Sequence, residues 1–88
     1  MRELVNEKIS VVTIFRKDSV KNEVIPYQIK WQARKYKISK VTYHHTLKEG
    51  KKLWHIFYVT DGNLDFKLKL DTDTLHWFLE EVTDGLTN

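Results

Sequence analysis

The residues best suited to chemistry in this chain are its four histidines, because it contains no cysteine. Imidazole serves as a metal ligand or as a general base near neutral pH. His44 and His45 are adjacent, so in an extended segment they point to opposite sides and cannot bind one ion together without a turn. A site between strands is possible in principle through His55 and His76, but no His-x-His or His-x-x-x-His spacing supports it. We therefore expect no metal site and no other cofactor.

Arrangements for nucleophilic or acid–base catalysis are also sparse. None of the three serines has a Gly-x-Ser-x-Gly context. The carboxylate pairs Asp71/Asp73 and Glu80/Glu81 lie beside turn and terminal signals, where we expect them to be solvated rather than enclosed in a pocket. With only three glycines, the chain offers no phosphate-cradling loop. These absences predict no catalytic residues and a protein that is not an enzyme.

Basic and aromatic residues interleave between Lys30 and Lys40. Small β domains bind single-stranded nucleic acids by combining backbone-contacting cations with aromatic rings that stack on bases. We therefore predict a non-catalytic binding module with nucleic acid as its leading partner. The predicted contact residues are Lys30, Arg34, Lys35, Lys37 and Lys40, with Lys48, Lys51 and Lys52 on an expected polar loop. Trp31 shares its parity with Tyr27 and Ile29, so we expect it in the core.

Charge is distributed unevenly along the chain. Residues 1–52 carry thirteen basic and five acidic side chains, for a net charge of +8, whereas residues 53–88 carry two and seven, for −5. One interpretation is a basic face that meets an anionic partner such as nucleic acid. The other is that oppositely charged residues on facing strands partly neutralise each other.

The length of 88 residues predicts one small domain with a single core. Three Trp, four Tyr and four Phe supply enough apolar area for a core without disulfides. The absence of cysteine favours a reducing compartment, and the cytoplasm is our default expectation. No apolar run approaches the roughly 20 residues of a membrane-spanning helix, so we expect no membrane partner.

The strongest structural signal is a β-hairpin over residues 54–70. Two alternating apolar runs flank Asp61-Gly62, a dipeptide that favours the positive φ angles of a tight turn. After the turn, Leu64, Phe66 and the following leucines share one side, which is the period of a half-buried strand. The hairpin therefore anchors the prediction of an all-β fold.

The rest of the chain predicts more strands. Apolar or alternating runs indicate strands at 9–15, 25–31 and 35–43, the last with a β-bulge near Ser39-Lys40 that repairs a slip in its alternation. Residues 1–7 are expected to form a tail or a helical turn, and residues 44–52 a polar loop. Residues 75–82 fit either a strand, which we favour, or a helix. Together these segments predict an antiparallel meander of about six strands that forms either a small barrel or a strongly curled sheet.

The first strand of the hairpin is apolar on both sides, although one small barrel has only one interior. Trp54, Ile56 and Tyr58 would lie opposite the face of Phe57 and Val59. A terminal segment would have to cover this second face; otherwise it predicts a homodimer or protein-interaction interface, which is the alternative function.

The run from Trp31 to Val41, and the aromatic residues after it, resemble a bacterial family of uncharacterised small β domains. The shared pattern is Trp, a small residue, Arg and Tyr, then a Trp-to-Tyr strand and a terminal Trp-x-Leu. The matching residues are Trp31, Ala33, Arg34 and Tyr36, then Trp54 with Tyr58, and Trp77 with Leu79. Ala33 stands where that family usually has glycine. The resemblance implies an all-β fold without a settled activity and a strand at the end of the domain.

Overall fold

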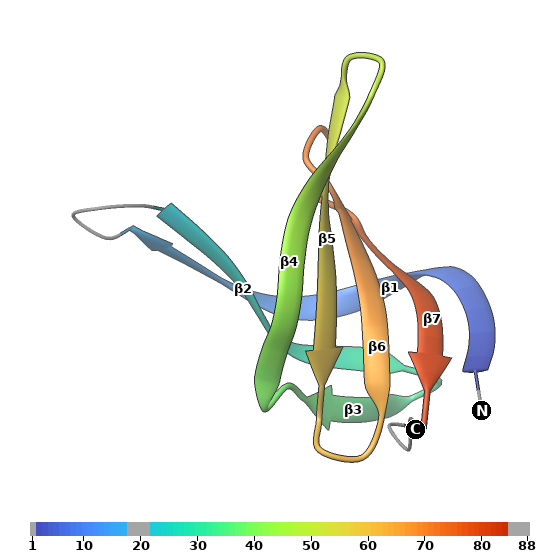
Figure 1. Cartoon of the computed structure of the whole chain (residues 1–88). Helices are drawn as coiled ribbons and strands as arrows, with labels where there is room; N and C mark the ends of the chain where they lie inside the picture. Colours follow the sequence, from blue (N-terminus) through green and yellow to red (C-terminus); the bar gives the residue numbers. More distant parts are fainter. Residues whose placement is uncertain (1, 18–21, 85–88) are drawn as a thin grey trace.

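A computed structural model describes residues 2–17 and 22–84, which form one antiparallel sheet of seven strands (Figure 1). The strands are β1 Arg2–Lys17, β2 Asn22–Trp31, β3 Arg34–Lys37, β4 Lys40–Glu49, β5 Lys52–Thr60, β6 Asp65–Asp71 and β7 Trp77–Thr83. Their order across the sheet is β3-β2-β1-β7-β6-β5-β4. No helix of the described residues is long and apolar enough to cross a membrane.

The sheet curls because β1 belongs to two layers. Residues from Arg2 to Ile9 pair with β7, whereas residues from Ser10 to Lys17 pair with β2. The register shifts between Leu4 and Glu7, where Asn6 adopts a φ of 52°, as expected of a bulge that bends a strand. In Figure 1, β1, β2 and β3 cross behind the layer made by β4 to β7. The sheet stays open between its two edge strands, β3 and β4, so of the two predicted forms it is the strongly curled sheet and not a closed barrel.

The seventh strand comes from the segment predicted as one bulged strand over residues 35–43. The chain leaves β3 at Ile38 and enters β4 at Lys40, on the opposite edge of the sheet. Backbone hydrogen bonds hold this passage, from Ile38 N to Tyr27 O (2.9 Å) and from Ser39 N to Thr60 O (2.9 Å). The slip in alternation at Ser39-Lys40 therefore marks a crossover between edges, not a bulge within one strand.

Two further predictions about local structure are wrong. Residues 44–52 are mostly strand, because β4 continues to Glu49 before a turn at Gly50, whose φ is 61°. Residues 2–7 are strand as well, since they pair with β7. In both places pairing with a neighbouring strand decides the structure of a polar segment that has no apolar alternation of its own.

The predicted hairpin and the final strand are confirmed. β5 pairs with β6 in continuous register from Trp54 opposite Asp71 to Thr60 opposite Asp65. The connection is longer than a two-residue turn, and the Asp61 carboxylate accepts hydrogen bonds from the backbone N–H groups of Asn63 (2.8 Å) and Leu64 (2.7 Å). The last segment is the strand β7, which excludes the helical alternative.

The core lies between the two layers, on the inner faces of the strands. Leu68 and Leu79 are fully buried, and Phe57 is 2% exposed. Trp31 is buried as predicted, and Trp77 closes the core from β7 by donating its indole N–H to Thr13 Oγ1 at 3.0 Å. Burial of each large apolar side chain contributes about 1.5–3 kcal/mol, so the domain is held without disulfides, as its aromatic content predicts.

Candidate nucleic-acid interface

The β2–β3 hairpin carries four of the eight predicted basic residues. Its turn is formed by Gln32 (φ 53°) and Ala33 (φ 61°), and the register places Lys30 opposite Lys35. Directly opposed like charges destabilise a strand pair. The arrangement therefore costs free energy of folding unless a negatively charged partner offsets it.

The five basic residues on β2, β3 and the start of β4 remain without acidic partners. None of them forms an ion pair with a described residue, whereas four basic side chains on other strands do. The basic residues without such a pair are Lys30, Arg34, Lys35, Lys37 and Lys40; the pairs elsewhere are Arg2–Glu81, Arg16–Glu23, Lys52–Asp71 and Lys67 with Glu80 and Glu81. Lys30, Lys35 and Lys37 share one face of the β2–β3 pair, and we call the surface that they form the basic hairpin face; Arg34, opposite the buried Trp31, belongs to the other face, and Lys40 begins β4. Of the two interpretations of the uneven charge, neutralisation by carboxylates therefore applies to those four residues and to none of these five.

An exposed aromatic ring lies next to the basic hairpin face. Tyr27 is 39% exposed, and the Lys37 ammonium lies over its ring, 5.5 Å from the centroid. The register of β1 and β2 shifts at this point, where Val12 pairs with Gln28 but Thr13 pairs with Pro26. The extra residue reverses the facing of the strand, so Pro26 and Ile29 are both buried and Tyr27 points outward. The expectation that Tyr27 shares the core face of Ile29 is therefore wrong.

The other three predicted contact residues lie at the far end of β4 and β5, at the tip of the hairpin that projects upward in Figure 1. Lys48 and Lys51 are exposed there, but Lys52 is engaged by the protein itself. Its ammonium lies 2.8 Å from Asp71 Oδ2 and 4.7 Å from the centroid of the Trp54 ring. The eight predicted residues therefore form two separate groups, not one surface.

Asp71 departs from the expectation that the carboxylates are solvated, because it is only 4% exposed. Its Oδ1 atom accepts a hydrogen bond from the Asp73 backbone N–H at 2.9 Å. The hydrogen bond from Lys52 is the main cause that lowers the pKa of Asp71, and the same contact raises the pKa of Lys52. This carboxylate organises the turn between β6 and β7.

Trp54, Ile56 and Tyr58 do lie together on the outer face of β5, away from the core. The ring of Phe78, from the last strand, packs edge-on against Trp54 with centroids 6.1 Å apart. Lysine side chains also cover this face, with the Lys69 ammonium 4.1 Å from the Trp54 ring centroid and the Lys67 ammonium 5.7 Å from that of Tyr58. Ile56 is left 3% exposed. Long lysine stems thus bury apolar surface while their charges stay in water.

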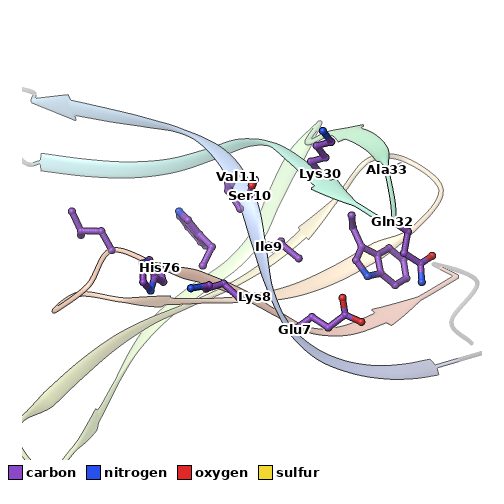
Figure 2. A pocket seen from close by; sticks show the side chains of 12 residues that line it. Glu7, Lys8, Ile9, Ser10, Val11, Lys30, Gln32, Ala33 and His76 are labelled. Atoms are coloured by element: carbon purple, nitrogen blue, oxygen red, sulfur yellow. The ribbon is translucent and has the colours of Figure 1, made fainter.

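A shallow hollow of about 680 Å³ adjoins the basic hairpin face, and Lys30 lines both (Figure 2). Figure 2 shows Lys8 and His76 on one side of the hollow, with Gln32 and Ala33 on the other. Three of its lining residues adopt positive φ although they are not glycine: Gln32, Ala33 and Leu75. Such strain often accompanies binding sites. The hollow therefore extends the candidate interface toward β7.

Sequence reasoning missed a pair of facing histidines. His44 on β4 and His55 on β5 lie with Nε2 and Nδ1 2.7 Å apart, and the His44 ring stacks on Phe57 with centroids 4.2 Å apart. Burial lowers the pKa of both imidazoles, and the neighbouring His55 contributes further for His44. Within the described ranges, no group of three or more His, Cys, Asp or Glu residues is placed to hold a metal ion. Recognition of β4 as a strand would have revealed this pair.

Comparisons with known proteins do not extend this description. No family model, no curated protein and no solved structure matches the chain. The resemblance to a family of small β domains stays a prediction, and the function has to be argued from the geometry.

Proposed function

We propose that this protein is a non-catalytic module that binds single-stranded nucleic acid through the basic hairpin face. The observation that carries the proposal is the opposition of Lys30 and Lys35 without an ion pair to any described residue. Phosphates along a bound strand would neutralise both lysines and release counterions from the nucleic acid. Four basic residues elsewhere in the domain, Arg2, Arg16, Lys52 and Lys67, lie against carboxylates, whereas Lys30 and Lys35 lie against each other.

Tyr27 gives the face a stacking platform. A base that stacks on an aromatic ring contributes about 1–3 kcal/mol to single-strand binding. The ring is solvent-exposed, and Lys37 already lies against it, so a stacked base would lie within reach of the lysines that contact its phosphate. A platform flanked by cations favours single strands, because the bases of a duplex are not free to stack on a side chain.

The proposal is tested by fluorescence anisotropy with a labelled short oligothymidine over a series of NaCl concentrations. The variant Lys30→Gln/Lys35→Gln/Lys37→Gln is expected to lower the slope of log K against log salt by about 2, because each lost single-strand contact contributes about 0.7. Lys17→Gln/Lys48→Gln/Lys51→Gln removes the same charge from other surfaces and is expected to retain most of the slope. Equal losses in both variants would mean that only net charge attracts the oligonucleotide, and would refute the proposed face.

A matched pair of variants tests the stacking role of Tyr27. Tyr27→Ala is expected to weaken binding about 5- to 150-fold, the equivalent of one lost base stack. Tyr27→Phe keeps the ring and is expected to bind within about twofold of the parent. An unchanged affinity in Tyr27→Ala would remove Tyr27 from the site.

A further inference from the structure

The opening in the sheet has the form of a gap between two diverging hairpins. Among the described residues, β3 pairs only with residues 28–31 of β2. The chain leaves β3 at Ile38, whose backbone N–H donates a hydrogen bond to Tyr27 O. Beyond that point no described strand pairs with β2 on this side, and β4 turns away toward the top of Figure 1. The chain itself therefore fills one end of the gap with β3 and leaves the other end open.

The border of the gap formed by β4 is a free strand edge. Within the described residues β4 pairs only with β5, along its whole length from Lys40 to Glu49. Its central residues, from Thr42 to Leu47, carry no carboxylate, lysine, arginine or proline. Folded proteins commonly protect exposed edges with such residues, because the unpaired backbone groups otherwise accept another strand. The centre of β4 lacks this protection.

Two cavities open along the gap, where the side chains of an added strand would lie. One, of about 350 Å³, lies between β2 and β4 and is lined in part by Val24, Val41 and Phe57. The other, of about 460 Å³, shares Val24 and His55 with the first and continues away from β4 along β1 and β2 to Phe15. Pockets for alternate side chains beside a free strand edge are the two features of peptide recognition by strand addition. A nucleic acid has no backbone N–H and C=O groups that could pair with β4.

The charged residues around the gap select the kind of peptide. Lys17 borders the second cavity, and Lys40 and Lys48 lie near the two ends of β4. None of these three forms an ion pair with a described residue, whereas Glu49 is the one carboxylate of β4. The Arg16–Glu23 pair at 2.8 Å is neutral overall. The surroundings of the gap are therefore net positive and complement acidic side chains.

We propose that the gap between β2 and β4 binds an extended segment of another protein, with alternating apolar and acidic side chains, by strand addition to β4. The apolar side chains enter the two cavities, and the acidic ones point to the outer face, on which the pairing with Thr60 places Lys40. The bound segment would lie along β2 beyond the end of β3 and would close the sheet. This site is separate from the basic hairpin face and does not rest on nucleic-acid binding.

The test uses an acetylated, amidated octapeptide of alternating valine and aspartate, titrated into ¹⁵N-labelled protein. The amide signals of residues 41–47 and 23–25 are expected to shift, with saturation below about 1 mM peptide. The same peptide with N-methyl groups on alternate amides is expected to bind at least about tenfold more weakly, because it cannot form the ladder. Equal binding of the methylated peptide, or no shifts in β4, would overturn the proposal.

Two protein variants separate this site from the proposed function. Lys40→Glu is expected to weaken binding of the valine–aspartate peptide at least about tenfold, whereas Lys30→Glu/Lys35→Glu is expected to retain peptide binding and to lose oligothymidine binding. Loss of peptide binding in both variants would reduce the interaction to general charge and contradict the site. Signals of β4 that shift with protein concentration in the absence of peptide would show that a second copy occupies the edge, which would also overturn the proposal.

Discussion

Lys35→Glu is expected to make the protein more stable and a weaker binder of nucleic acid. The register places this side chain directly opposite Lys30, so the substitution replaces a like-charge pair with an opposite-charge pair. Cross-strand charge pairs contribute about 0.2–1 kcal/mol, and exposure keeps the value at the lower end. We therefore expect a gain of about 0.5 kcal/mol in the free energy of unfolding, which is about 2–4 °C in Tm for a domain of this size.

Thermal unfolding followed by circular dichroism at low salt measures the gain, and the same melt in about 1 M NaCl should remove most of it by screening. Lys48→Glu is the matched control, because Lys48 lies opposite Leu53 and has no charged cross-strand partner. Oligothymidine anisotropy on Lys35→Glu should show a salt slope lower by at least about 0.7. A loss of stability in Lys35→Glu, or an equal gain in Lys48→Glu, would refute the reasoning that the basic hairpin face is strained by its own charge.

Three further predictions concern the fold. Ala33→Gly is expected to raise the free energy of unfolding by about 0.5–1 kcal/mol. Ala33 has a φ of 61°, a backbone conformation that costs alanine about 1 kcal/mol or more. A lower denaturant midpoint in Ala33→Gly would contradict this prediction. Leu68→Ala, at a fully buried position, should cost about 2–5 kcal/mol, whereas Leu75→Ala, at a side chain 60% exposed, should change the denaturant midpoint little. Burial lowers the pKa of His44 and His55, so the unfolded chain binds more protons and the free energy of unfolding falls as pH drops through about 6.5. His44→Gln should flatten this dependence in thermal melts between pH 5 and 7. An unchanged slope of stability against pH would contradict the prediction.

The hairpin of β5 and β6 could be predicted because its signal is local. Alternation over Phe66, Leu68 and Leu70 fixes which side is buried, and Asp61-Gly62 indicates where the chain reverses. β4 could not be predicted in the same way, because nearly all of its side chains are exposed on both faces. A strand of this kind has no apolar period, and pairing with β5 alone determines its structure. That the sheet stays open could not be predicted either, because a bulge and a crossover at Ser39-Lys40 leave the same break in the alternation of apolar residues.

The candidate interface was predictable in part. The turn at Gln32-Ala33 is enough to place Lys30 near Lys35, and the basic composition of the hairpin points to an anionic partner. The outward position of Tyr27 was not predictable, because it depends on a bulge in the pairing with β1, a contact between distant segments. Its neighbour Trp31 follows the simple alternation and is buried as expected.

The most direct test of the account is to map oligothymidine binding on ¹⁵N-labelled protein. The largest amide shifts are expected between Tyr27 and Lys37, the Tyr27 ring protons should move upfield as a base stacks on them, and these changes should diminish together as salt is raised. Shifts centred on the tip of the β4–β5 hairpin, or no shifts at low salt, would contradict the central claim that the basic hairpin face binds single-stranded nucleic acid.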